Sequence, residues 1–419
     1  MATTKIKCPV EGVIDLDRLP GVPAKRVEAL IDAPELQRLR RIRQLGFSAL
    51  IYPGATHTRF AHSLGAFQGA QRTLTQLRAQ GADVPDEWFV ATALACLLHD
   101  LGHGPFSHTF ERVTERRHEQ RTLEIVRSGP TVSEGLEAIG TGTVERVAQL
   151  LTGQVGVDRL GWLADLVSSA LDCDRMDYLR RDALATGAQY GAFDRDWLIR
   201  EITPTADGEA IVVIEKGRTA VEQYLIGRYH MFQNVYLHKT SRGFEGAFLA
   251  LCKRVRALGE SAMPEGLRGL VTLFDEDQPL DAFLRLTDDH FHLDFEILVD
   301  HEDPTLRALA RSLHRRRPLQ QRSLLAERGD RGALEAVHRR ERDVAAARGL
   351  DPDTAVWMDA AQDVPYRPYT PESGHQSLRI LRSDGVMVDV TELSPSLEAL
   401  SKKIVARRVY WIDPALIAD

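Results

Sequence analysis

Four side chains that suit a metal site fall in three separated stretches of the sequence. His62 lies in RFAHSLG, His99 and Asp100 open HDLGHGPFSH, and Asp174 lies in DCDRMDYLRRD. Imidazole nitrogen combined with carboxylate oxygen suits several divalent ions. Such a set leaves positions open on a six-coordinate ion, as a catalytic metal requires. We therefore expect a catalytic divalent metal, with iron, manganese, zinc, nickel and magnesium all left open.

Each stretch alone also fits an ordinary helix. A lone His62 is more often a hydrogen-bonded or surface histidine than a ligand. However, His99 and Asp100 close an apolar run, where two unpaired polar groups would be costly to bury. His103 and His108 follow within nine residues. The concentration of imidazoles favours a functional site over a chance pairing.

Helices must bring these side chains together. Apolar residues at helical spacing predict helices over 33–44, 59–80, 86–102, 143–152, 159–185 and 221–239. Ligands from three helices can meet only inside a helical bundle. The spacing along 33–44 places Arg38, Arg40, Arg41 and Arg43 opposite its apolar side. The fold class expected is mostly α.

The last third of the chain changes character. AIVVIEK at 210–216 and ARRVYWID near the end are typical of strands, and SLRILRSDGVMVDVTEL predicts a hairpin around a D-G turn. Residues 311–348 are rich in arginine and predict an exposed helix with a mobile loop, and PYRPYTPESG is turn-rich. The helical core should therefore carry a smaller α+β C-terminal part.

Bulk properties exclude several classes of protein. The net charge of −7 argues against a protein held on nucleic acid by overall electrostatics. The four cysteines form no C-x-x-C pair, which fits a reduced cytoplasm. Neither a secretory leader nor a membrane-spanning run is visible. We expect a cytoplasmic protein without a membrane partner.

The three stretches resemble the HD superfamily of metal-dependent phosphohydrolases, whose H…HD…D signature matches His62, His99–Asp100 and Asp174. YPGATHTRFAHSLG, HDLGHGPFSH and DCDRMDYLRRD resemble the deoxynucleoside triphosphate triphosphohydrolases of the SAM-and-HD-domain type, over roughly residues 5–250. We expect no SAM domain ahead of the core. The resemblance implies an N-terminal extension packed on the core over 1–50, an HD domain over 51–265, and a C-terminal α+β region over 266–419.

The resemblance also implies residue roles. His103, His118 and Glu111 would form an acid–base group beside the α-phosphate. For His118 the plainer interpretation is a solvated helix residue, and for Tyr236 a core aromatic. Contacts with the nucleotide substrate are implied at Gln44, Arg59, His108, Arg175, Tyr178, Asp182, Arg228 and Tyr236.

Some positions depart from the family pattern. Arg175 stands where a lysine is usual, and Phe232 and Leu237 replace polar residues near the sugar and base. Several family members are activated by a nucleotide bound at subunit interfaces, and the resemblance leads us to expect a homo-oligomer. Asp32, Gln37 and Arg40 match that effector site, although Lys7 and Val13 replace polar contacts there. A charged helix face capped by Asp32 is the alternative interpretation of the trio.

The leading hypothesis is an enzyme that converts a deoxynucleoside triphosphate (dNTP) and water to deoxynucleoside and tripolyphosphate. Phe232 and Leu237 keep open another phosphate ester, such as a dinucleoside polyphosphate (diadenosine tetraphosphate), a guanosine alarmone or a nucleoside monophosphate. The arginine-rich segment 311–348 motivates a third hypothesis, a nucleotide sensor or nucleic-acid-binding protein without turnover.

Overall fold

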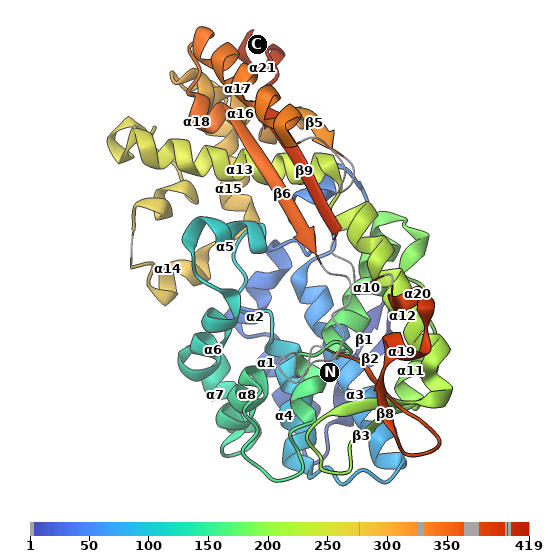
Figure 1. Ribbon diagram of the computed structural model, residues 1–419. Helices are drawn as coiled ribbons and strands as arrows, with labels where there is room; N and C mark the ends of the chain where they lie inside the picture. Colours follow the sequence, from blue (N-terminus) through green and yellow to red (C-terminus); the bar gives the residue numbers. More distant parts are fainter. Residues whose placement is uncertain are drawn as a thin grey trace.

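The structure is a computed structural model that describes residues 4–275, 277–324, 331–363, 377–398, 400 and 404–418. Figure 1 shows a body of helices, with one sheet along its flank and another at the end where the C-terminus lies. The fold is mostly α with small sheets, as predicted. No helix in the described ranges is both long and apolar enough to cross a membrane.

The chain begins with a hairpin of β1 (Lys5–Cys8) and β2 (Gly12–Asp15), followed by α1 (Ala24–Ile31), α2 (Pro34–Gln37) and a 3-10 turn, η2 (Arg38–Arg41). The helix predicted over 33–44 is therefore wrong beyond Arg41. Ile42 is extended, because the next residue, Arg43, bridges to Thr58. Arg38 is also buried rather than exposed, and its guanidinium donates to backbone carbonyls.

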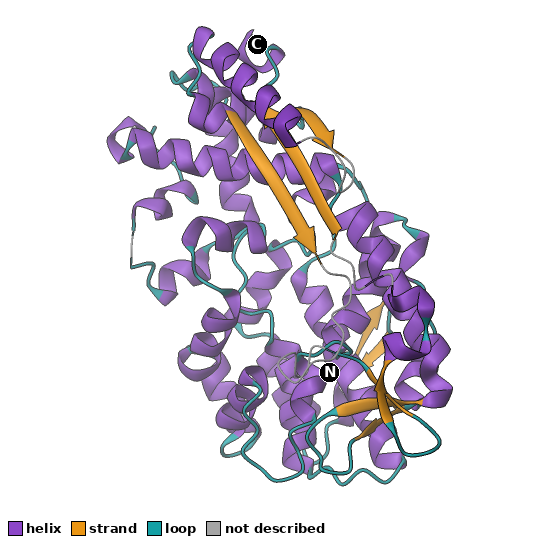
Figure 2. Cartoon of the chain, in the orientation of Figure 1, coloured by secondary structure: helices purple, strands orange, loops and turns teal. Residues whose placement is uncertain are grey.

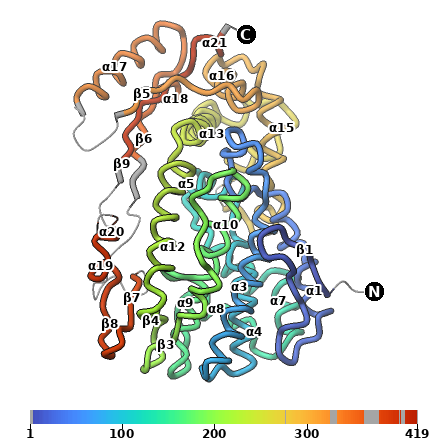
Figure 3. Tube along the Cα trace, turned by 90° about the vertical axis from the view of Figure 1, so that its right-hand side faces the viewer, coloured from blue at the N-terminus to red at the C-terminus, as the bar shows by residue number. Residues whose placement is uncertain are grey.

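The helical core positions the residues of interest. It consists of α3 (Arg59–Ala79), α4 (Asp86–Leu98), α5 (His108–Thr114), α6 (His118–Ser128), α7 (Val132–Ile139), α8 (Thr143–Thr152), α9 (Leu163–Val167) and α10 (Cys173–Thr186). Every residue of α4 from Trp88 to Leu98 is buried, because α3 and α8 pack against it. α10 packs on the other side of α3, as Figure 3 shows. The predicted helices over 59–80 and 143–152 are confirmed.

The single helix predicted over 159–185 is wrong, because the chain breaks between α9 and α10. Asp172 caps α10: its carboxylate accepts from the backbone amides of Ser169 (2.9 Å) and Arg175 (2.6 Å). An N-cap of this kind fixes where a helix starts. Asp174 consequently lies in the first turn of α10.

The second half of the chain builds the remaining helices and both larger sheets (Figure 2). The helices are α11 (Arg195–Arg200), α12 (Arg218–Met231), the π-helical turn η6 (Phe232–Tyr236), α13 (Lys239–Leu258), α14 (Leu280–Arg285), α15 (Asp288–Leu298), α16 (Pro304–His314), α17 (Arg331–Ala347), α18 (Pro352–Ala355), α19 (Val390–Leu393), α20 (Pro395–Glu398) and α21 (Ala415–Ala418). One sheet has the order β3-β4-β7-β8, from Ile202–Pro204, Ile211–Ile214, Arg379–Leu381 and Met387–Asp389; the other is β5-β9-β6, from Gln320–Leu324, Ile404–Trp411 and Val356–Asp363.

The strand predicted within 210–216, the D-G hairpin and the last strand are confirmed as β4, β7–β8 and β9. The exposed helix predicted over 311–348 is wrong in part. α16 is largely buried, with Arg311 itself only 5% exposed, and residues 320–324 form strand β5 before α17 begins. The stretch PYRPYTPESG lies outside the described residues.

Candidate active site

Four predicted ligands converge from three parts of the helical core. His62 comes from α3, His99 and Asp100 follow α4, and Asp174 comes from α10. The His62 Nε2 atom lies 2.9 Å from Asp174 Oδ1 and 3.3 Å from His99 Nε2, and His99 Nε2 lies 3.3 Å from Asp100 Oδ1. His62, His99 and Asp100 offer ligand atoms close enough together to hold a divalent cation. Asp174 Oδ1 lies beside both imidazole nitrogens, 2.9 Å from that of His62 and 3.5 Å from that of His99.

The outward nitrogens of both histidine rings are also fixed. His62 Nδ1 lies 2.7 Å from Asp177 Oδ2, and His99 Nδ1 lies 2.8 Å from a carbonyl oxygen of α4. Arg181 donates to both oxygens of Asp177, each at 2.8 Å. A Cβ atom at Gly65 would lie 2.0 Å from Asp177 Oδ1, so this glycine lets the pair approach α3. Such outer partners orient metal-binding imidazoles.

Arg59 is buried against Asp100. Its Nη1 donates to Asp100 Oδ2 at 2.5 Å, and its Nε donates to Ser107 Oγ at 2.8 Å. Burial raises the pKa of the Asp100 carboxyl, but the charge of Arg59 first, then those of His99 and His103, outweigh burial and hold the pKa well below its usual range. The predicted phosphate clamp is thus also a partner of a predicted metal ligand.

The predicted acid–base group is assembled around one carboxylate oxygen. Glu111 Oε1 lies 2.9 Å from Nδ1 of both His108 and His118, and 3.4 Å from His103 Nδ1. The His103 and His118 rings stack with centroids 3.8 Å apart. His103 Nε2 lies 3.3 Å from Asp100 Oδ1, which links the group to the four-residue cluster.

Burial and neighbouring groups shift the pKa values of His103 and Glu111 in this group. Burial, then the nearby positive charges of Arg59 and His118, hold the pKa of His103 well below its usual value. Burial raises the pKa of Glu111, but its hydrogen bonds with His108 and His118 lower it further than burial raises it. A neutral imidazole beside an anionic carboxylate is suited to proton transfer near neutral pH.

A stripe along α10 leads away from the cluster. Asp174, Tyr178 and Asp182 follow one another at four-residue spacing, which places them on one helix face. The rings of Tyr178 and Tyr236 lie 6.2 Å apart. Asp182 accepts a hydrogen bond from the Tyr236 hydroxyl at 2.8 Å, and its other oxygen lies 2.7 Å from His57 Nε2.

Three other predicted substrate residues carry buried polar atoms without a hydrogen-bond partner among the described residues. These atoms are Arg175 Nε, Arg228 Nε and Gln44 Oε1. The Nη1 atom of Arg175 is occupied by Asp172 and a backbone carbonyl, and the Arg228 guanidinium lies 5.4 Å from the centroid of Phe232. Buried polar atoms normally have partners, so these three suit a polar ligand.

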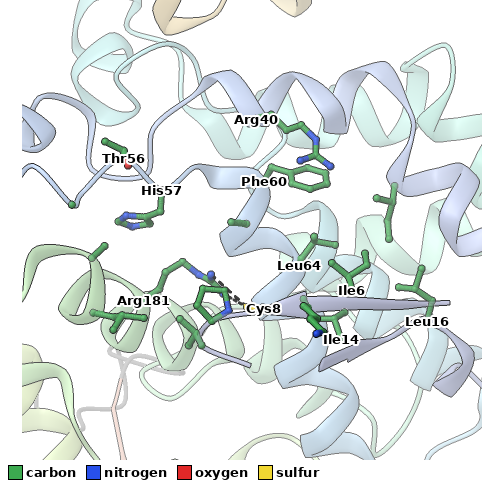
Figure 4. A pocket seen from close by; sticks show the side chains of 18 of the residues that line it. Ile6, Cys8, Ile14, Leu16, Arg40, Thr56, His57, Phe60, Leu64 and Arg181 are labelled. Atoms are coloured by element: carbon green, nitrogen blue, oxygen red, sulfur yellow. Dashed lines mark hydrogen bonds between the residues drawn. The ribbon is translucent and has the colours of Figure 1, made fainter. Parts of the chain in front are cut away.

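A cavity of about 540 Å³ lies beside the N-terminal hairpin (Figure 4), and its lining includes His57, the partner of Asp182. Asp32 and Arg40 line it together with Lys7 and Arg181. Arg40 stacks over Phe60, 3.8 Å from the ring centroid. Gln37 does not line the cavity. Its side-chain oxygen accepts a hydrogen bond from Arg40 Nε at 2.6 Å and so helps to orient the Arg40 guanidinium.

Sequence reasoning missed three neighbours of the site. Asp177 had a usable signal, because it follows Asp174 by three residues on the same helix. His57 stands only five residues before His62, but nothing in its spacing indicated Asp182 as a partner. Ser107 lies within HDLGHGPFSH, but its residue type alone gives no signal for a contact with Arg59.

The chain is similar to known proteins over most of its length. Residues 59–182 match the HD domain model, and residues 193–411 match the HD associated region. The chain is 31% identical to the uncharacterized protein YwfO of Bacillus subtilis over 406 residues, which is 96% of this chain and 92% of that protein. A solved structure of a Bacteroides thetaiotaomicron phosphohydrolase superposes with a TM-score of 0.82 at 28% identity, covering 97% of this chain and 99% of the other.

A more distant relative carries a named activity. The Dictyostelium discoideum homolog of the deoxynucleoside triphosphate triphosphohydrolase SAMHD1 is 27% identical over 230 residues, which is 51% of this chain and 43% of that protein. The chain thus spans under half the length of that relative. The two family matches and the coverage of the Bacillus and Bacteroides proteins show that this chain belongs to the HD-domain phosphohydrolases.

Proposed function

We propose that the protein hydrolyses deoxynucleoside triphosphates to deoxynucleosides and tripolyphosphate. One observation carries the proposal: the α10 stripe runs from Asp174 in the metal cluster, through Tyr178, to the hydrogen-bonded pair Asp182 and Tyr236. A ligand that places a phosphate at the cluster would then place a sugar at that pair. The similarity to the Dictyostelium enzyme supports this nucleotide class.

The proposed reaction is a displacement at the α-phosphorus. His62, His99, Asp100 and Asp174 would hold a divalent cation, which when bound lowers the pKa of a water and polarises a phosphoryl oxygen. The water oxygen bonds to phosphorus, the bond from phosphorus to O5′ breaks, and O5′ takes up a proton.

Proton movement falls to the group around Glu111. His103 is held neutral and lies 3.3 Å from Asp100, so it can accept a proton near the cluster. His118, hydrogen-bonded to Glu111, can donate one to the leaving oxygen. His108, whose side chain is 72% exposed, lies 2.9 Å from Glu111 through Nδ1 and would present the rest of its ring to the phosphates.

The rest of the substrate would meet the polar atoms that have no partner among the described residues. Arg175 and Arg228 offer cationic N–H groups to phosphate oxygens, and Gln44 offers a carbonyl to a sugar hydroxyl. Tyr236, whose hydroxyl donates a hydrogen bond to Asp182, would leave little room for a ribose 2′-hydroxyl. Phe232, whose ring lies 5.0 Å from that of Tyr236, gives the far end an apolar wall.

The 540 Å³ cavity favours a second binding function, that of a nucleotide effector site in a homo-oligomer. Lys7 and Arg40, which stacks on Phe60, would supply positive charge to a bound nucleotide. Asp32 would supply a hydrogen-bond acceptor for an amino group of the base. A nucleotide that raises turnover and the oligomeric mass together would support this function. Arg40→Ala should abolish both responses while leaving metal content unchanged.

The decisive experiment is product identification with a nucleotide panel. The purified protein, loaded in turn with Mn²⁺, Fe²⁺, Zn²⁺, Ni²⁺ or Mg²⁺, is given dNTPs, NTPs, diadenosine tetraphosphate, a guanosine alarmone and nucleoside monophosphates. Tripolyphosphate and deoxynucleoside from dNTPs are the expected products. Orthophosphate or mononucleotide products would redirect the assignment to another phosphate ester, and tight nucleotide binding with no product would point to a sensor.

A further inference from the structure

Asp288 is distant in sequence from the HD motifs but lies next to two segments of the active site. It is the first residue of α15 and is 2% exposed. Its Oδ1 accepts from the backbone amide of Phe106 at 2.9 Å, and its Oδ2 accepts from that of Arg43 at 2.9 Å. Both carboxylate oxygens are thus used to hold backbone, one segment each.

The segment held by Oδ1 is strained. Phe106 and Ser107 have φ angles of 55° and 58°, and neither is glycine. This backbone conformation is unfavourable for a residue that carries a Cβ atom, and it persists only when the surroundings fix it. The Phe106 ring stacks on Phe47 with centroids 4.2 Å apart, which anchors the side chain. The Asp288 bond anchors the backbone amide of the same residue.

The strained turn places Ser107 where Arg59 needs it. Ser107 Oγ accepts from Arg59 Nε at 2.8 Å, and Arg59 Nη1 in turn donates to Asp100 Oδ2 at 2.5 Å. The turn also leads directly into α5, which carries His108 and Glu111. Displacement of the turn would therefore move both the partner of Asp100 and the acid–base group.

The buried side chain of Arg38 also links the start of α15 to the segment that contains the strained turn. Arg38 donates through Nε to the carbonyl of Leu286 at 2.9 Å and through Nη2 to the carbonyl of His103 at 2.9 Å. The residues just before Asp288 are thus tied to the start of the turn. The stretch 286–288 is thus linked to residues 103–106 at two points, directly through Asp288 at Phe106 and through Arg38 at His103.

We propose that Asp288 is a positioning residue, which holds the strained turn 106–107 so that Ser107 fixes Arg59 against Asp100 and α5 presents its acid–base residues. The C-terminal region is thereby part of the machinery of the HD core. The effect on turnover depends on the proposed hydrolysis of dNTPs; the effect on the turn does not.

Asp288→Asn tests this role. The asparagine keeps the size of the side chain but presents an amide donor to one of the two backbone donors, so one bond must break. The matched control is Asp289→Asn, at the next position, where the aspartate is exposed. Hydrogen exchange is followed by mass spectrometry on peptides covering 101–110, 41–46 and, as an internal reference, α4. Each variant is compared at the same interval below its own unfolding midpoint, so that global stability is matched.

The expected result has three parts. In Asp288→Asn, hydrogen exchange rises in 101–110 and 41–46 and is unchanged in α4. The Mn²⁺ affinity, measured by calorimetry, falls severalfold. The kcat for dNTP hydrolysis falls roughly ten- to hundredfold with KM little changed, as expected for misplaced catalytic groups. Exchange and Mn²⁺ affinity that match those of Asp289→Asn would overturn the proposal, even if no nucleotide proved to be a substrate. If Asp288→Asn fails to fold, Ser107→Ala must reproduce the losses of Mn²⁺ affinity and kcat, and its failure to do so would also overturn it.

Discussion

The Nδ1 atom of His62 lies 2.7 Å from Oδ2 of Asp177, while Nε2 of the same ring lies 2.9 Å from Oδ1 of Asp174. Burial lowers the pKa of His62, but the two carboxylates outweigh burial and raise it to about 10. The imidazole is thus held between an inner carboxylate, which belongs to the candidate metal cluster, and an outer one, which belongs to its support.

Asp177→Asn should weaken metal binding without removing a proposed ligand. An asparagine has no charge and only one acceptor oxygen, so it cannot both accept a hydrogen bond from His62 and form an ion pair with Arg181. The Arg181 guanidinium is then left as an unpaired buried charge. Loss of an outer partner typically costs ten- to a hundredfold in metal affinity, and breaking a buried ion pair costs about 3 kcal/mol of the free energy of unfolding. Calorimetric Mn²⁺ titration and urea denaturation measure the two effects. Asp158→Asn, at an exposed position, is the control, and equal Mn²⁺ affinities in the two variants would contradict the assignment.

Asp174→Ala should remove most of the bound metal and nearly all turnover while the helical fold stays intact. The substitution deletes a carboxylate from the cluster, but the N-cap of α10 is Asp172, which is untouched. Metal content by elemental analysis and helicity by circular dichroism are the measurements. An active, metal-free Asp174→Ala protein would eliminate this cluster as the reaction centre.

Glu111→Gln should lower kcat and spare KM. Three imidazole Nδ1 atoms face Glu111 Oε1, so an amide at this position presents at best one weaker acceptor. General acid–base groups typically contribute about 10²–10⁴-fold to rate, and we expect a loss within this range. Steady-state kinetics at saturating metal measure the change. Glu115→Gln, at an exposed position of the same segment, should behave as the wild type, and a mere rise in KM for Glu111→Gln would argue for a binding role instead.

The sequence predicted the inner half of this site because its residues fall in contiguous motifs. His62, His99, Asp100 and Asp174 were placed together by ligand chemistry and helical spacing, and the structure brings them together. The same reasoning failed at 159–185, where apolar periodicity hid a break. Asp172 is a usable signal for that break, since aspartate is a favoured N-cap residue and its carboxylate accepts from the backbone amide of Arg175.

The support that Asp288 gives to the site could not have been predicted from local patterns. Asp288 acts on Phe106 and Arg43 through backbone amides 182 and 245 residues away, and a hydrogen bond to a backbone amide leaves no mark on the residue that donates it. The helix expected over 33–44 failed for a related reason. Arg38 was assigned to a solvated face, whereas the carbonyls it binds belong to segments that only tertiary packing brings near.

Tyr236→Phe should weaken discrimination between deoxyribose and ribose. The substitution removes the hydroxyl that donates to Asp182 at 2.8 Å and leaves a buried carboxylate oxygen less satisfied. A lost hydrogen bond to a charged group corresponds to about 1.5–3 kcal/mol, so kcat/KM for dNTPs should fall roughly tenfold or more. Competition between a dNTP and the matching NTP measures the ratio. Tyr229→Phe, whose hydroxyl bonds only Gln233 among the described residues, is the control, and an unchanged ratio in Tyr236→Phe would contradict the sugar assignment.

Acidification should erase the difference between wild type and Asp288→Asn. Burial raises the pKa of the Asp288 carboxyl to about 6, although its hydrogen bonds with the backbone amides of Arg43 and Phe106 lower it. The charge of Arg43 also lowers this pKa, and the charge of Asp289 raises it. The Arg38 guanidinium interacts with the same carboxylate. A protonated carboxyl keeps only one good acceptor for the two amides. The ratio of wild-type to Asp288→Asn turnover should therefore be large at pH 7.5 and approach one near pH 5.

The sign of the stability effect separates this loss from unfolding. The folded pKa of about 6 exceeds the unfolded value of about 3.9, so the contribution of this group to stability is full below about pH 4 and is lost as the pH rises through 6. Acid therefore does not unfold the protein through Asp288, and the loss of turnover that protonation of this group causes is local to the turn. Turnover at saturating metal, measured from pH 5 to 8 beside Asp289→Asn, gives the ratio. A ratio that stays constant across this range would mean that Asp288 acts through its shape alone and not through its charge.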